Sequence, residues 1–281
     1  MKLDPISQYA VEETELRLKR FSKNLRHAAK HPEDPEAIHD LRVSIRRVVQ
    51  TSKTFRELLD PASVKKLRER LHKVMDLCAA VRNCDVALVL LDQVGITTGA
   101  AVSRLKKTRD AAAEKLHRNL KKERLKRHPA PGVRSHPKER DWKLDQSLEA
   151  NLCRVLPALA QEFFDSGKAA ISAHASYQTL HQFRLQAKRF RYTLELFERF
   201  YGSEMASGAG MLKELQDLLG AINDCATTLV LLGRDRHAVA AVGKLLRQRK
   251  ARFKTHARSQ LVPQELDWWK RWLAQPALSA A

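Results

Sequence analysis

Apolar residues recur with a helical period of about 3.6 along most of this 281-residue chain, and no stretch alternates as a strand does. This pattern is the strongest constraint on the fold. Only ten glycines and ten prolines interrupt the chain, so long runs of helix formers have few places to turn. The pattern predicts an all-α fold.

Prolines mark the expected starts of two helices in the first half. Asp34 and Asp60 each precede a proline, and this order suits the cap and first turn of a helix. Residues 128–141 are rich in proline and charge, as linkers are. The expected helices cover about 5–30, about 34–59, a third from Asp60 onward, and about 97–128.

The second half of the chain repeats the first. The apolar positions of the second expected helix, shifted by about 142, fall on apolar or aromatic residues again: Ile38, Leu41, Ile45, Val48, Phe55 and Leu59 correspond to Leu180, Phe183, Ala187, Phe190, Phe197 and Tyr201. VRNCDVALVLL and AVSRLKKTR likewise match INDCATTLVLL and AVGKLLRQR. Generic amphipathic helices explain single matches but not the shared order, so we infer a tandem duplication.

A duplication of about four helices predicts two antiparallel four-helix bundles related by pseudo-two-fold symmetry. We expect residues 1–128 to form the first bundle, 129–141 the linker and 142–281 the second bundle.

Charge sets the class of partner. Lys and Arg number 52 against 32 Asp and Glu, a net charge of +20. Such an excess repels itself in the compact state, so it indicates a polyanionic partner: nucleic acid, an anionic membrane or inorganic polyphosphate.

The cysteines and the N-terminal sequence indicate the compartment. Cys78, Cys84, Cys153 and Cys225 form no CxxC pair, so we expect apolar fillers in a reducing compartment. The sequence shows no signal peptide and no apolar run of about 20 residues. We therefore expect a soluble, cytoplasmic protein, no membrane partner, and polyphosphate granules as a candidate location.

Each copy places a line of cations beside its apolar stripe. At 100° per residue, His39, Arg42, Arg46 and Lys53 fall within about 60° of arc, and Arg47 lies apart. The equivalent line, within about 80°, is His181, Arg184, Lys188 and Arg191, with Arg189 apart.

A solvated helix face would interleave acids at i,i+4 spacing. The first line carries none, whereas Glu195 interrupts the second. Anion binding is therefore the favoured interpretation, more clearly for the first line, and we expect the two lines to form the walls of one basic groove.

Other cations are candidates of lower specificity. Arg109 and Arg249 occupy matching inward positions, which favours a shared anion channel, although Arg109 could instead pair with Asp85. Arg17 and Arg20 flank the apolar stripe of the first expected helix, and the second copy has no cationic equivalents. We expect the C-terminal tryptophans, Trp268, Trp269 and Trp272, to pack the last helix onto the body.

The phrases DPEAIHDLRVSIRR and LHQFRLQAKRFRYTLELF resemble the two signature helices of the CHAD family, the histidine-containing α-helical domain. The resemblance spans about residues 5–260 and implies two helical bundles that bind inorganic polyphosphate through a basic groove or pore. It assigns the family's histidines to His39 and His181. Its basic positions fall on Arg42, Arg46, Arg47, Arg184, Lys188, Arg189 and Arg191. Where the family tends to have Arg-Asp-x-Asp, this chain has Arg82-Asn83-Cys84-Asp85, which we expect to cap or brace helices.

Three functions remain as hypotheses: non-catalytic polyphosphate binding, which we favour, nucleic-acid binding, and enzymatic phosphate chemistry at His39 or His181. Aromatics are only 6% of the chain, which disfavours base stacking, so nucleic acid is expected only as a nonspecific competitor. Metal-dependent phosphate hydrolysis needs clustered carboxylates or His and Asp ligands, and the sequence of neither copy shows such a cluster. We expect no enzyme activity, no catalytic residue, no cofactor and no metal, and the sequence leaves the oligomeric state open.

Overall fold

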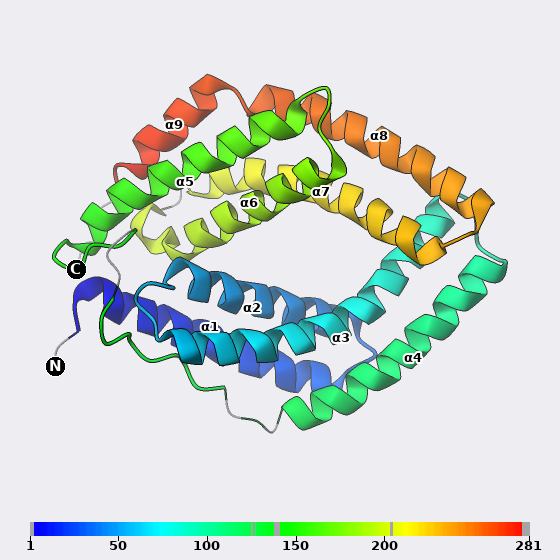
Figure 1. The fold of residues 1–281 in the computed structure, drawn as a ribbon, viewed down its shortest axis with the longest axis horizontal. Coiled ribbons are helices and arrows are strands. Elements are labelled where there is room, and N and C mark those ends of the chain that lie inside the picture. The colour runs from blue at the N-terminus through cyan, green and yellow to red at the C-terminus, as the bar shows by residue number, and fades with distance from the viewer. Residues whose placement is uncertain (1–2, 125, 127, 138–140, 203–204, 277–281) are drawn as a thin grey trace. The chain divides into compact units, whose positions relative to one another are not determined.

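The structure, a computed structural model, describes residues 3–124, 126, 128–137, 141–202 and 205–276. Within these residues every regular element is a helix, and the only β-type pairing is an isolated bridge between Leu59 and Val133. The predicted all-α class is therefore confirmed. The helices are α1 (Pro5–Lys30), α2 (Pro35–Thr54), α3 (Pro61–Gln93), α4 (Ala100–Glu123), α5 (Leu148–Ile171), α6 (Tyr177–Leu196), the 3₁₀ turn η1 (Glu198–Phe200), α7 (Met205–Leu232), α8 (Arg236–Gln260) and α9 (Pro263–Leu273) (Figure 1).

The chain divides into two compact units, which we call the first unit (residues 9–136 and 224–247) and the second unit (1–8, 137–223 and 248–281). The boundary at 136/137 lies inside the expected linker. Residues 224–247, however, pack with the first half, because Cys225 and Val242 join Cys84 and Val102 in one apolar core. The expected division into 1–128, 129–141 and 142–281 stays a prediction, as does the two-fold relation.

Helix α2 begins as the sequence predicts and ends earlier. The Asp34 side chain accepts a hydrogen bond from the Glu36 N–H at 2.9 Å, so the predicted cap is confirmed. The helix stops at Thr54 rather than near Leu59 because the following chain pairs with the linker. After a turn at residues 55–58, the Asp60 N–H donates to the Gly132 carbonyl at 2.8 Å beside the bridge between Leu59 and Val133.

The expected apolar positions of both signature helices are buried. None of the predicted positions on α2 and the turn after it, or on α6 and the turn after it, exceeds 5% exposure: Ile38, Leu41, Ile45, Val48, Phe55, Leu59, Leu180, Phe183, Ala187, Phe190, Phe197 and Tyr201. The repeat therefore identified a core-facing stripe in each copy correctly.

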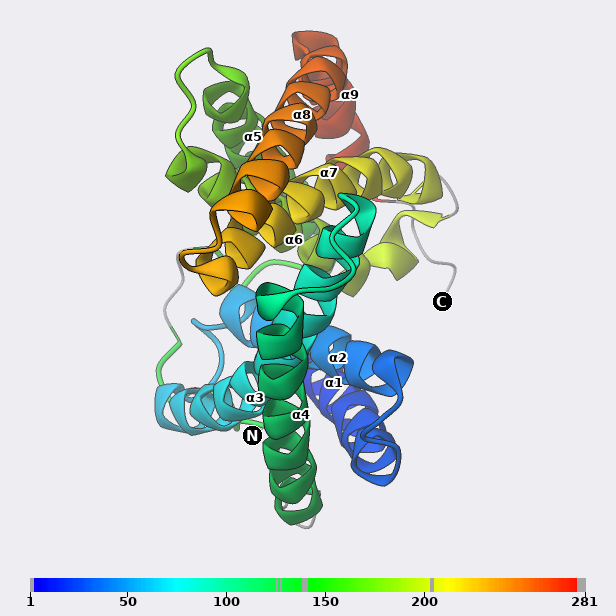
Figure 2. The same ribbon diagram turned by 90° about the vertical axis from the view of Figure 1, so that its right-hand side faces the viewer.

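Helices α3 and α4 form an antiparallel hairpin, seen from two sides in Figures 1 and 2. Helix α4 is shorter than the expected 97–128. It starts after Gly99, whose φ of 109° suits a residue without a Cβ. At its other end the Lys126 N–H donates to the Glu123 carbonyl at 3.0 Å, an i,i+3 turn that closes the helix; residues 125 and 127 lie outside the described part.

Aromatic rings fill the core of the second unit. Phe163 stacks on Phe183 and on Phe190, with ring centroids 5.3 and 5.1 Å apart. Trp269 of α9 is fully buried with its ring 5.1 Å from that of Phe190. The expected packing of the last helix is thus confirmed for Trp269, whereas Trp268 remains 36% exposed.

Among the residues that the structure describes, one helical segment, Gly210–Leu232, is long and apolar enough to cross a membrane by length and composition alone. Cys225 and Leu232 of this segment lie in the apolar core of the first unit. The core helix of a soluble protein can meet the same criteria of length and composition.

The four cysteines are free thiols of unequal accessibility. Burial raises the pKa of Cys78 to about 11, and Cys84 and Cys225 are also buried, whereas Cys153 is half-buried. Since the thiolate is the nucleophile, we expect Cys153 to react first with an alkylating reagent at neutral pH. Mass spectrometry of peptides after a short pulse would check this. Equal labelling of Cys78 and Cys153 in the folded protein would contradict it.

Candidate functional site

The first ridge, which we define as His39, Arg42, Arg46 and Lys53, follows α2 along the edge of its buried stripe. His39 and Lys53 are exposed, and Arg42 and Arg46 are half-buried. These residues recur every three, four or seven positions, so their side chains share one helix face. The ridge is therefore a continuous cationic strip of the first unit.

The half-buried arginines of the first ridge are held near the core. Arg42 lies close enough to Cys78 of α3 for its charge to oppose the effect of burial on the pKa of that thiol. The Nε of Arg46 is buried and has no hydrogen-bond partner among the described residues. A buried guanidinium N–H without an acceptor costs free energy, so this position favours an anion.

The second ridge, His181, Arg184, Lys188 and Arg191, follows α6 of the second unit. His181 and Arg184 line a hollow of ≈ 10 Å³ together with residues of α7. The Nδ1 of His181 is buried there, with no hydrogen-bond partner in the described part of the chain. The ring of Tyr177 lies 6.2 Å from that of His181.

The far end of the second ridge is partly neutralised. Arg191 donates from Nε to Glu195 Oε1 at 3.0 Å and from Nη1 to Gln216 Oε1 at 3.1 Å. The interruption by Glu195 that the sequence indicated is thus an ion pair in the structure. The equivalent of Glu195 on α2 is Lys53, so the first ridge keeps a cation at this place.

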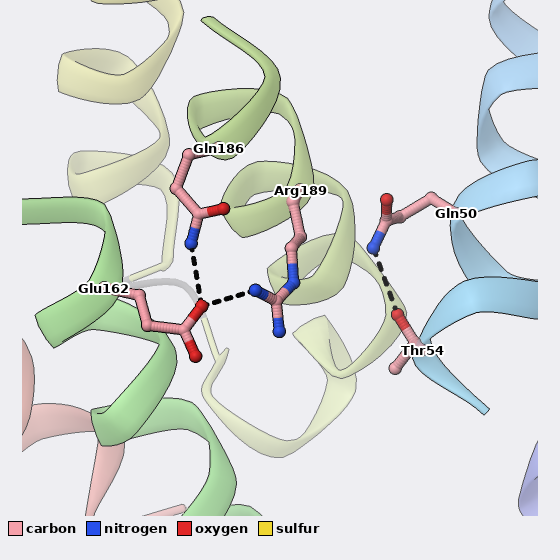
Figure 3. A network of polar contacts seen from close by, with 5 residues as sticks. All are labelled: Gln50, Thr54, Glu162, Gln186 and Arg189. Atoms are coloured by element: carbon pink, nitrogen blue, oxygen red, sulfur yellow. Dashed lines mark hydrogen bonds and ion pairs between the residues drawn. The ribbon is translucent and has the colours of Figure 1, made fainter. Parts of the chain in front are cut away.

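The arginine that the helical wheel sets apart is also paired in the second unit. Glu162 of α5 accepts hydrogen bonds from Arg189 and, at 3.0 Å, from Gln186 (Figure 3). Glu162 is the second-copy equivalent of Arg20. The second copy therefore has an acid where the first has a cation, and this acid pairs with Arg189. On α2, three residues after the equivalent Arg47 in the sequence, Gln50 donates a hydrogen bond to Thr54 at 3.3 Å (Figure 3).

Both inward arginines have protein partners. Arg109 donates from Nε to Asp85 Oδ1 at 3.0 Å, and this bond raises the pKa of Arg109 further above neutrality. Arg249 donates from Nη1 to the Ala221 carbonyl at 2.9 Å. The pairing with Asp85, weighed as the alternative, is therefore confirmed, as is the bracing role expected for the segment around it. The shared anion channel stays a prediction.

The two cations found only in the first copy lie on α1. Arg17 pairs with Glu13 at 3.2 Å, whereas Arg20 is exposed. The part of both arginines in binding stays a prediction.

Sequence reasoning missed several neighbours of the ridges. Tyr177 lies one helical turn before His181, so its i,i+4 spacing could have identified it. Gln216 comes from α7, and no local pattern joins it to Arg191. Within the described residues, no group of three or more His, Cys, Asp or Glu side chains is placed to hold a metal ion.

Several solved structures share this fold, and two of them are compared with this chain below. "PptA from Streptomyces chartreusis" superposes with a TM-score of 0.61 at 19% identity, over 91% of this chain and 98% of that chain. The CHAD domain from the plant Ricinus communis gives a TM-score of 0.58 at 20% identity, over 97% and 94%. No curated protein matches this chain.

The family model of the CHAD domain matches residues 14–233, a span that contains both signature helices and both ridges. The match agrees with the two duplicated phrases and with the all-α fold, and so confirms the resemblance seen in the sequence. This chain belongs to the CHAD domain family.

Proposed function

We propose that this protein binds inorganic polyphosphate through its cationic ridges, without catalysing a reaction on it. The observation that carries the proposal is the first ridge, where four basic residues follow one edge of α2 and the buried Nε of Arg46 has no acceptor among the described residues. Membership of the CHAD family, in which the sequence resemblance implies polyphosphate binding, supports it.

The chemistry of the ridge suits a flexible polyanion. Each internal phosphate carries about one negative charge, and cations one helical turn apart lie about 5–6 Å from one another, so they can contact successive parts of the chain. The guanidinium groups of Arg42 and Arg46 can each donate two parallel hydrogen bonds to phosphate oxygens, whereas Lys53 acts as a point charge. His39 donates when neutral and gains charge beside a polyanion.

The second ridge should bind more weakly on its own, because Glu195 already neutralises Arg191. A polyphosphate long enough to contact both ridges would gain from effective concentration, so affinity should rise with chain length. That the ridges form the walls of one groove stays a prediction from the sequence. So do the cytoplasmic location and the candidate location on polyphosphate granules.

Titration with short, intermediate and long polyphosphates at two salt concentrations tests the proposal. If roughly three or four charges are neutralised, affinity should fall about 20- to 50-fold between about 50 and 200 mM salt, by analogy with single-stranded nucleic acid. Affinity should also rise with length. Affinity that changes with neither salt nor length would contradict the proposal.

Two further measurements separate the competing functions. Duplex DNA that displaces polyphosphate at equal phosphate concentration would favour nucleic-acid binding instead. Release of inorganic phosphate from polyphosphate with Mg²⁺ or Mn²⁺ would contradict the non-enzymatic assignment, as would a phosphorylated His39 or His181 detected by mass spectrometry.

A further inference from the structure

A separate cavity of ≈ 300 Å³ opens in the first unit between α1 and the segment that follows α4. This volume is at the lower end of the range for small-molecule sites. The residues that line it belong to neither ridge: Ser22, Leu25 and Arg26 on α1, then Arg124, Lys126, His128 and Pro129.

Three cationic side chains line the cavity, and the described residues provide an ion pair for only one of them. Lys126 pairs with Glu123, the helix-end acid, at 2.5 Å. Arg26 donates from Nε to the Ser22 carbonyl at 3.2 Å, which leaves its charge uncompensated. In the described ranges neither Arg26 nor Arg124 makes an ion pair, so about two positive charges converge on a concave surface, which attracts anions.

His128 gives a second, independent indication of a ligand. Its side chain is only 3% exposed, and neither ring nitrogen has a hydrogen-bond partner among the described residues. The nearest acid atom, Glu123 Oε1, lies 3.7 Å from Nε2, and the ring packs edge-on against Phe21, with centroids 5.0 Å apart. Buried polar groups in native proteins nearly always have a partner, so a ring that lines a cavity without one favours a polar ligand.

The protonation state of His128 determines which hydrogen bonds its ring can make to a ligand. Burial lowers the pKa of this imidazole, with Arg70 and Lys126 acting in the same direction and Glu123 opposing. Near neutral pH the ring is therefore uncharged, with one N–H donor and one acceptor nitrogen.

We propose that this cavity binds a small organic phosphomonoester, with the phosphoryl group held by Arg26, Arg124 and the ring N–H of His128, and the organic part against Leu25 and Pro129. Two unmatched guanidinium groups correspond to the charge of about −1.5 to −2 on a phosphomonoester at neutral pH, and their planar forks suit phosphate oxygens. A carboxylate carries only one charge, which makes it the poorer ligand.

Histidine-detected NMR of the full-length protein tests the proposal with phenyl phosphate as the probe. We expect a saturable shift of the assigned His128 signals. The double variant Arg26→Gln/Arg124→Gln should weaken this binding about tenfold or more. Both side chains are exposed, so the variant should fold, which a thermal melt would verify.

Three comparisons make the test specific. The matched control Lys121→Gln removes an exposed cation of α4 outside the cavity and should leave the phenyl phosphate affinity unchanged. Benzoate should bind at least about tenfold more weakly than phenyl phosphate. The proposal is overturned if His128 shows no saturable shift, if benzoate binds equally well, or if the double variant binds like the wild type.

Discussion

Replacing Arg42 and Arg46 together with glutamine should lower the affinity for long polyphosphate about 100-fold at low salt. A hydrogen bond to a charged group contributes about 1.5–3 kcal/mol, so the loss of two such contacts, less than additive, amounts to roughly 3 kcal/mol. Each 1.4 kcal/mol is a factor of ten in affinity. Glutamine keeps much of the aliphatic stem that packs beside the buried stripe, and therefore mainly the charge is removed.

The salt dependence of the same variant distinguishes lost contacts from damage to the fold. Each neutralised phosphate contributes about 0.7 to the slope of log affinity against log salt, so the slope should decrease by about 1.4. The free energy of unfolding should stay the same or rise slightly, because two like charges one turn apart on α2 no longer repel each other. Isothermal calorimetry at several salt concentrations and urea unfolding would measure both.

The matched control is Arg189→Gln on α6. Glu162 already compensates this arginine, so its replacement should change polyphosphate affinity less than about threefold, even though the formal charge also falls by one. Replacing Arg184 and Lys188 should have an intermediate effect, since Arg191 at the end of the same ridge is partly neutralised. If Arg189→Gln weakens binding as much per charge as the first-ridge variant, net charge rather than the ridge determines affinity.

Local sequence was sufficient for the features that depend on one helix. The cap at Asp34, the buried stripe of α2 and the positions of the ridge cations all follow from spacing within the helix. The end of α2 cannot be predicted from spacing within the helix, because the hydrogen bond from the Asp60 N–H to the Gly132 carbonyl joins residues far apart in the chain. The pattern of apolar residues continues to Leu59 as in a helix, although residues 55–58 form a turn and Leu59 pairs with Val133.

The ion pairs of the candidate site likewise depend on contacts between helices, which local sequence does not predict. The sequence identified Arg109 as inward-facing and identified Asp85 as one possible partner, but only the packing of α3 on α4 establishes that they meet. The repeat contains a further signal whose consequence depends on packing between helices. It showed that Glu162 replaces Arg20, and in the structure Glu162 neutralises Arg189 through the contact of α5 with α6.

Replacing Trp269 with alanine should lower the free energy of unfolding by about 3–5 kcal/mol, the usual cost of deleting a fully buried aromatic ring. Trp269 is 0% exposed and packs on Phe190, so the deletion leaves a cavity where α9 joins the core of the second unit. The adjacent Trp268 is the matched control. It is 36% exposed, and its ring lies 5.5 Å from that of Trp272 and 5.2 Å from that of Trp269, so Trp268→Ala should cost clearly less than Trp269→Ala, about 1–2 kcal/mol.

Gly208 of α7 gives a sharper test, because a Cβ at this position would lie 2.4 Å from a ring carbon of Trp269. In the wild type, Gly208→Ala should destabilise by about 1–3 kcal/mol, since the bulky ring must move. In the Trp269→Ala background the clash is absent, and alanine is the better helix former by about 1 kcal/mol, so the same substitution should stabilise. Urea unfolding of the four proteins measures this change of sign. If Gly208→Ala has the same effect in both backgrounds, the ring of Trp269 does not occupy the space against Gly208.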